Sequence, residues 1–189
     1  MGDGGRRYGQ GMSRSRRPLI ALACLAALLA AAALPWSASA VGSTPSRHRL
    51  LVSKELWATI DVCSPTDQPN TVGIRGSMPG DGQPRERMYM SFRLQYLDRA
   101  NSRWLDLSSG ATPQFVAVGA AGSARQGGRS FQLVPVAGKP AFTLRGVVDF
   151  QWRRGNRVLQ SAVRITTAGH QSLAGADPAG FSAPTCLIG

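Results

Sequence analysis

The stretch Met88-Tyr89-Met90-Ser91-Phe92-Arg93-Leu94-Gln95-Tyr96 decides the fold of this chain, because apolar and polar side chains alternate along it without a break. Successive side chains of a β-strand point to opposite faces of a sheet, so a strand with one buried face has a period of two. The apolar set that begins at Met88 is therefore predicted to face a core. Arg93 and Gln95 are predicted to face outward.

Two other stretches show the same alternation. In residues 56–63 the even-numbered side chains are apolar and share one face, which places Cys63 on the opposite, outer face. In residues 142–154 the inner face is apolar except at Gly146. A glycine inside a strand often marks a β-bulge, and we expect one there.

The dipeptide Gly155-Asn156 predicts a β-hairpin that connects this strand to residues 159–165. In the second strand of the hairpin, Leu159, Val163 and Ile165 form the apolar set and are predicted to face inward. A second hairpin loop and four shorter strands, bounded by Gly, Pro or Ser, are predicted at 98–102 and at 71–77, 103–107, 114–118 and 130–135.

Roughly eight short strands separated by turns predict an all-β fold. The expected architecture is an antiparallel, immunoglobulin-like β-sandwich of about seven to nine strands, of the immunoglobulin or fibronectin III kind, formed by residues 54–189. A small barrel is the alternative. No helix is expected after residue 40, because no helical periodicity occurs there.

The first 40 residues have the pattern of a secretory signal peptide. Five arginines precede an uninterrupted apolar run from Leu19 to Leu34, and Pro35 breaks this run shortly before Ala38-Ser39-Ala40. The order predicts a signal helix followed by cleavage after Ala40, with Ala38 and Ala40 as the small residues of the cleavage site. The protein is therefore predicted to be secreted or extracellular, with retention at the cell envelope left open.

Three other interpretations of this segment stay open. The apolar run is short for a membrane anchor, which needs about 20 residues. Cys24 is a candidate for lipoprotein processing, although Ala21 stands where a leucine is usual. Ser15-Arg16-Arg17 resembles a twin-arginine signal, so the export route is undecided. Residues 41–53, rich in Gly, Ser, Thr and Pro, are predicted to be a flexible lead-in to the domain.

The chain is strongly basic, with a formal net charge of +12. Removal of residues 1–40 takes away five arginines and Asp3, which leaves a net charge of 12 − 5 + 1, or +8. We expect no nucleic acid as a partner despite this charge, because the protein is predicted to be exported and the basic rows lack interleaved aromatic rings for stacking.

Two cysteines remain after the predicted cleavage, Cys63 and Cys186. An even pair in an oxidising compartment predicts one disulfide, which would connect the first strand to the C-terminal tail. Neither cysteine has a neighbouring histidine or basic cluster in the sequence that would indicate a reactive thiol.

Five segments resemble a family of secreted actinobacterial proteins of uncharacterised function: LWATIDVC (56–63), IRGSMPG (74–80), LRGVV (144–148), TAGH (167–170) and ADPAGFSAPTC (176–186). The resemblance extends from about residue 54 to the end of the chain. It implies a signal peptide, an immunoglobulin-like sandwich and a terminal disulfide between Cys63 and Cys186, and it implies no activity.

Residues able to perform catalysis are few. The two histidines, His48 and His170, lie outside the predicted strands, and we find no motif for a nucleophile, a zinc site or a phosphate-binding loop. His170 with Asp177 is too small a set for a metal site, and no cofactor is expected. Glu86 with Asp149 is a possible glycosidase pair, but arginines flank Asp149 on its own face and favour a surface ion pair.

A basic strand surface is the strongest candidate for a ligand-binding site. Its proposed members lie at outward positions of three strands that we expect to be neighbours: Arg93, Arg145, Arg153 and Arg164. Guanidinium groups bind phosphate and carboxylate, which suits an anionic polymer of the cell envelope. Trp57, Tyr89 and Trp104 are possible exposed aromatic residues that could form a platform for sugars.

The sequence therefore predicts a secreted or surface-associated binding module without enzymatic activity. Its partner would be an anionic envelope polymer or another surface protein, and the oligomeric state is open. The alternative is a hydrolase that acts on an extracellular, carbohydrate polymer, which would need paired acids in a cleft.

Overall fold

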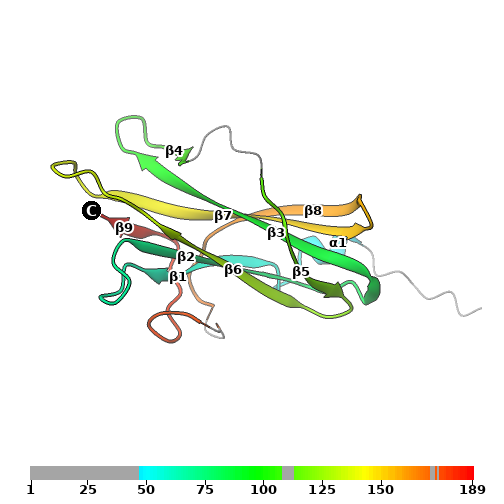
Figure 1. Ribbon diagram of the computed structural model, residues 1–189. Helices are drawn as coiled ribbons and strands as arrows, with labels where there is room; N and C mark the ends of the chain where they lie inside the picture. Colours follow the sequence, from blue (N-terminus) through cyan, green and yellow to red (C-terminus); the bar gives the residue numbers. More distant parts are fainter. Residues whose placement is uncertain (1–46, 108–112, 171–172, 174) are drawn as a thin grey trace, which may run out of the picture. The chain divides into compact units, whose positions relative to one another are not determined.

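The computed structural model describes residues 47–107, 113–170, 173 and 175–189. These residues form two antiparallel β-sheets that pack face to face (Figure 1). The predicted antiparallel sandwich of seven to nine strands is confirmed. The predicted signal peptide with Ala38 and Ala40 lies outside the described residues, as do residues 41–46 of the predicted lead-in.

The smaller sheet has three strands and the larger has six. Across the smaller sheet the order is β1 (Trp57–Cys63), β2 (Thr71–Met78) and β6 (Arg125–Gln132). Across the larger sheet the order is β4 (Arg103–Asp106), β3 (Gln83–Asp98), β7 (Phe142–Arg154) and β8 (Arg157–Ile165). Two further strands extend the edges of the larger sheet, β5 (Val116–Ala121) beside β3 and β9 (Cys186–Ile188) beside β7.

This strand order is that of an immunoglobulin-like sandwich. In chain order, β1, β2 and β6 correspond to strands A, B and E of one sheet, and β3, β7 and β8 correspond to strands C, F and G of the other. All eight predicted strands are present, and the predicted hairpin at Gly155-Asn156 joins Arg154 to its partner Arg157. β9 was not predicted, because three residues are too few to show a period.

The core lies between the two sheets and contains the apolar set of β3. Met88, Met90 and Leu94 are fully buried or nearly so, which confirms the inward face predicted for this strand. Trp152 of β7 is also fully buried, and its indole nitrogen donates a hydrogen bond of 3.0 Å to the Pro79 carbonyl. Each large apolar side chain buried in this way contributes about 1.5–3 kcal/mol to folding.

Gly146 lies on the inner face of β7, but the predicted bulge at this position is wrong. The pairing of β7 with β3 continues in register from Leu144 to Arg153. A Cβ atom at Gly146 would lie 2.7 Å from Thr166 Cγ2 and 2.8 Å from Ile74 Cδ1, so the glycine lets the facing sheet approach closely. The missing side chain serves packing between the sheets.

A β-bulge occurs instead in β1. Ile60 pairs with Ile74 and Val62 pairs with Gly73, so Asp61 is the extra residue. A bulge reverses the face of every later side chain in its strand. Cys63 therefore packs against the core, and the outward position predicted for it is wrong.

The reversal at Asp61 allows Cys63 to form a disulfide with Cys186. The bond connects β1 of the smaller sheet to β9 of the larger sheet, and it confirms the predicted pair. The two cysteines are 123 positions apart in the sequence.

The inner side of β8 is covered by a short helix, α1 (Arg47–Leu51). This helix corrects the expectation of no helix after residue 40, and it lies inside the range predicted as a flexible lead-in. Leu50 is buried in the core, and Arg47 donates a hydrogen bond of 3.0 Å to the Leu159 carbonyl. In the part of the chain that the structure describes, no helix has the length and apolar character needed to cross a bilayer.

The chain after β8 runs back along the free edge of β1. Thr167 N donates to the Ala58 carbonyl, Ala183 pairs with Ile60, and Asp177 N donates to the Asp61 carbonyl. An edge strand with unpaired N–H and C=O groups is prone to associate with other chains. The described residues of the tail pair with several of these groups and so cover this edge of the sandwich.

Candidate functional site on the outer face of the larger sheet

The outer face of the larger sheet brings together three of the four arginines proposed as a binding surface. Directly opposed residues of an antiparallel pair lie on the same face. Arg93 opposes Val147, and Arg145 opposes Gln95, so both arginines lie on the outer face of β3 and β7. Arg153 lies on the same face and opposes Arg87.

Arg164 does not belong to this surface, and its predicted position is wrong. It opposes Val148, which is fully buried, and therefore lies on the inner face of β8. Its Nη2 donates a hydrogen bond of 2.5 Å to the Leu51 carbonyl at the end of α1. The helix thus provides an internal partner for Arg164.

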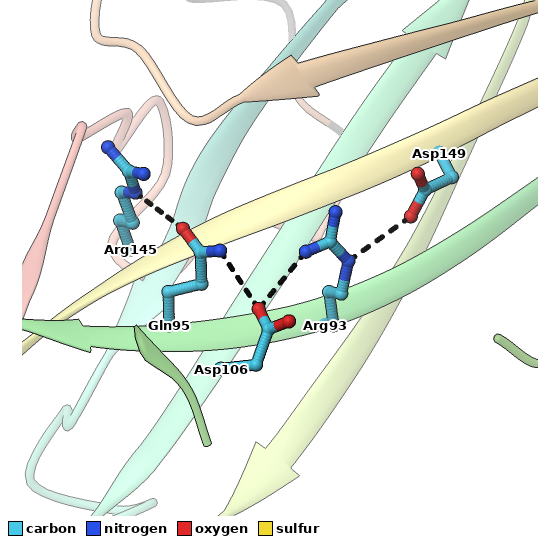
Figure 2. Close-up of polar contacts among 5 residues, drawn as sticks. All are labelled: Arg93, Gln95, Asp106, Arg145 and Asp149. Carbon is cyan, nitrogen blue, oxygen red and sulfur yellow. Dashed lines mark hydrogen bonds and ion pairs between the residues drawn. The ribbon is translucent and has the colours of Figure 1, made fainter. Parts of the chain in front are cut away.

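Arg93 is neutralised by two carboxylates (Figure 2). Its Nη1 is 3.1 Å from Asp106 Oδ1, and its Nε is 3.4 Å from Asp149 Oδ2. Burial raises the pKa of Asp149, the charge of Arg93 opposes this rise, and the charge of Asp106 adds to it. Two acids on one arginine leave Arg93 little residual charge for a ligand.

Arg145 has no carboxylate partner among the residues that the structure describes. Its Nε donates a hydrogen bond of 2.9 Å to Gln95 Oε1, and its guanidinium lies 4.4 Å from the centre of the Trp104 ring. Gln95 in turn donates to Asp106, which links Arg145 to the Arg93 cluster (Figure 2). Burial, and then the positive charge of Arg93, lower the pKa of Arg145. A bound anion would oppose both effects, because an adjacent negative charge stabilises the charged guanidinium.

Arg153 repeats this arrangement near the other end of β7. Its Nε donates a hydrogen bond of 2.7 Å to Gln151 Oε1. Its guanidinium lies 4.3 Å from the centre of the Tyr89 ring and 4.8 Å from that of Phe115. No described carboxylate forms an ion pair with it. Tyr89 and Trp104, considered above as a platform for sugars, are instead covered by arginines.

The two stacked arginines share the same fixed geometry. In each arginine, Nε donates a hydrogen bond to a glutamine side chain and an aromatic ring orients the guanidinium plane. Neither arginine forms a hydrogen bond through its Nη groups to any described residue. These Nη groups can bind a phosphate or carboxylate with little loss of side-chain entropy. Arg145 and Arg153 are eight residues apart on one strand, which corresponds to about 26 Å.

A row of exposed aliphatic side chains lies beside these arginines on the same face. Val163 opposes Asp149, Ile165 opposes Val147, and Leu187 opposes Thr143. Their exposed fractions are 51%, 47% and 58%. The inward position predicted for Val163 and Ile165 is wrong. Alternation shows which side chains share a face of a strand, but it does not show which of the two faces is buried.

His170 and Asp177 do not form a joint site. The His170 ring stacks on Trp57 with 4.2 Å between ring centres, whereas Asp177 pairs with Val62, five residues further along β1 and so about 16 Å away. Burial lowers the pKa of His170. Among the described residues, no group of three or more potential ligands could hold a metal ion.

Glu86 and Asp149 do not flank a common space either. Asp149 lies on the outer face, whereas Glu86 is buried and lies 2.8 Å from Arg154 Nη2. The acidic neighbour of Glu86 is Asp81, in the turn between β2 and β3. Burial, together with a side-chain hydrogen bond to Glu86, raises the pKa of Asp81 to about 6. Sequence reasoning missed this pair because neither residue belongs to a recognisable pattern.

Comparison with models of protein families and with curated proteins finds no match.

Proposed function

We propose that this protein is a secreted or surface-associated binding module that holds an anionic polymer on the outer face of its larger sheet. The observation that carries the proposal is the pair of stacked arginines, Arg145 and Arg153, whose Nη groups have no partner among the described residues. Arg93, with its two carboxylates, serves mainly to hold Gln95 and Asp106 in place beside Arg145.

The spacing of the two arginines favours a polymer over a small anion. A single phosphate or carboxylate contacts only one of two guanidinium groups that are about 26 Å apart. An extended chain with repeated negative charges contacts both, and the second contact then forms at high effective concentration. A phosphate-bearing polymer of the cell envelope has this chemistry.

The test uses the cleaved, oxidised protein and poly(glycerol phosphate) as the probe. The double variant Arg145→Glu/Arg153→Glu should weaken binding at least tenfold, because each reversal replaces an attraction with a repulsion. Binding of the unchanged protein should also weaken steeply as salt is added. A free phosphate monoester should bind far more weakly than the polymer.

A matched control removes the effect of net charge alone. Arg49→Glu/Arg129→Glu makes the same change in charge away from this face, and Arg129 also contacts an aromatic ring, that of Phe131, at 5.2 Å. At physiological salt, where interactions between distant charges are screened, this variant should bind the polymer with an affinity within about twofold of that of the unchanged protein. Equal losses in the two double variants would refute a specific surface.

A further inference from the structure

The outer face of the smaller sheet is hollow, in contrast to the face described above. Four pairs of residues from β2 and β6 form its floor, and their side chains are short apart from Arg75 and the glutamines. The pairs are Ser77 with Gln126, Arg75 with Gly128, Gly73 with Ser130, and Thr71 with Gln132.

Arg75 is held down on this floor. Its Nε lies 2.6 Å from Asp61 Oδ2, and the Asp61 side chain is almost completely buried. A Cβ at Gly128 would lie 3.3 Å from Arg75 Cζ, and a Cβ at Gly175 would lie 3.2 Å from Arg75 Nη2. The two glycines therefore lie close against the guanidinium, and the Arg75 side chain keeps an exposed fraction of 20% at the centre of the face.

Three cavities follow one another along this floor. The first, of about 390 Å³, is lined by Trp57, Ser77 and His170 among others. The second, of about 220 Å³, lies over Arg75 and Gly128, and the third, of about 430 Å³, over Thr71 and Gln132.

The second and third cavities share Ser130. From Ser77 to Thr71 the floor extends over six residues of β2, which is about 20 Å. Tail residues beside the edge of β1, among them His170 and Gly175, border the floor on one side, and β6 is the edge strand on the other side.

The lining determines what this groove can bind. It offers hydroxyl, amide and guanidinium groups along its length and the stacked rings of Trp57 and His170 at one end. Apolar side chains that would hold the side chains of a peptide are scarce in these cavities. Sugars combine many hydroxyl groups with an apolar ring face, and they are bound by polar side chains together with the face of an aromatic ring.

We infer that the outer face of the smaller sheet is a groove for an extended saccharide chain of several residues. This site is separate from the proposed anion-binding face, since the two lie on opposite outer faces of the sandwich. The ligand is a neutral glycan, because the charges of the lining balance: Asp61 compensates Arg75, and the cavities also contain Glu55 and Asp67 together with Arg125 and Arg129. One module could then contact a glycan and an anionic polymer at the same time.

The indole N–H signals of the cleaved, oxidised protein provide the test. Three tryptophans remain after residue 40: Trp57 in the groove, Trp104 on the opposite face and Trp152 in the core. Tetra-N-acetylchitotetraose, cellotetraose and maltotetraose are titrated in turn, each beside its monosaccharide. At least one tetrasaccharide should shift the Trp57 signal saturably and bind at least tenfold more tightly than its monosaccharide, while the other two indoles stay unchanged.

Two variants and one control complete the test. Ser130→Tyr fills the groove where two cavities meet, and it should weaken tetrasaccharide binding at least tenfold while the Trp152 signal shows an intact core. Trp57→Ala removes the reporting indole, so its binding is measured by calorimetry, and it should be weakened to a similar extent. Trp104→Ala should leave glycan binding within twofold, and so should Arg145→Glu/Arg153→Glu.

These outcomes separate the groove from the anion-binding face. The inference is overturned if none of the three tetrasaccharides shifts Trp57, if Ser130→Tyr binds as well as the unchanged protein, or if an extended peptide binds the groove while all three glycans fail. Loss of polymer binding in Arg145→Glu/Arg153→Glu with glycan binding intact supports both sites independently.

Discussion

On the outer face of β3 and β7, long side chains lie flat on the sheet and contact one another, whereas on the outer face of β2 and β6 short side chains leave hollows. Arg145 covers Trp104 on the first face, whereas on the second face Arg75 lies against Gly128, which has no side chain to cover it. The same fold thus presents a filled face with surplus positive charge and an open face with balanced charge. The difference shows that side-chain length, independently of strand pairing, sets whether the outer face of a sheet is filled or hollow.

The largest expected effect concerns the disulfide, because it anchors the tail that forms one wall of the open face. Cys63→Ala/Cys186→Ala should lower the free energy of unfolding by about 4 to 5 kcal/mol, because it releases the constraint on a very long loop of the unfolded chain. Urea unfolding measures this loss.

The same variant also tests the comparison of the two faces. Under native conditions the Trp57 indole signal should broaden or shift, whereas that of Trp104 should stay in place. A reduced sample of the unchanged protein serves as the control and should match the variant. Equal disturbance of both signals would show that the tail does not support the open face in particular.

An intermediate effect is expected from Asp81, whose turn connects the two sheets. The folded protein binds its proton more tightly than the unfolded chain, where the pKa has the ordinary value of 3.8, because the folded value is about 6. The stabilisation from this proton is therefore fully present below about pH 4 and is lost as the pH rises through 6. Asp81→Asn should remove this dependence.

Urea unfolding at several pH values checks this prediction. Between pH 4 and pH 6.5 the unchanged protein should lose on the order of 1 to 2 kcal/mol more stability than Asp81→Asn. The turn belongs to both sheets, so the Trp57 and Trp104 signals should disappear together as the protein unfolds. If the free energy of unfolding depended on pH in the same way in the unchanged protein and in Asp81→Asn, the assignment of this proton to Asp81 would be contradicted.

The smallest effect on stability is expected from the carboxylates that neutralise Arg93. Asp106→Asn/Asp149→Asn should change the free energy of unfolding by less than about 1 kcal/mol, because both ion pairs remain partly accessible to solvent and such pairs contribute little. Binding of poly(glycerol phosphate) should tighten, since a third arginine becomes available between Arg145 and Arg153.

The dependence of that binding on salt should steepen by roughly one further ionic contact. Glycan binding on the opposite face should not change in this variant. A polymer affinity equal to that of the unchanged protein would show that Arg93 takes no part even when its partners are removed.

Much of the fold follows from alternation in the sequence, and one of the errors occurs where an extra residue breaks the pairing. The uninterrupted alternation from Met88 to Tyr96 identified the inner face of β3 correctly. In β1, the extra residue Asp61 moves Cys63 from the outer to the inner face. The alternation in the sequence still looks unbroken there, because the apolar Val62 occupies a position where an inward-facing residue is expected. Bulges are set by pairing between strands, which a single sequence does not show.

The candidate sites were less predictable than the fold. Three arginines of the proposed surface were placed correctly, but Arg164 was not, since its inner position depends on a five-residue helix that has no periodic signal. The partners Asp106 and Gln95 of Arg93 and Arg145 come from pairing between β3 and β4. The groove was missed because Gly128 and Ser130 show no periodic pattern. Their place on the floor of the groove depends on pairing with Arg75 and Gly73 of β2, which the sequence does not show.

The bond between Cys63 and Cys186 closes the main chain into a covalent ring that contains most of the domain. A protease that cuts the backbone once between these residues opens the ring without releasing a fragment. In an environment rich in proteases, a nicked molecule would thus keep both outer faces attached to each other. It would separate into pieces only after reduction.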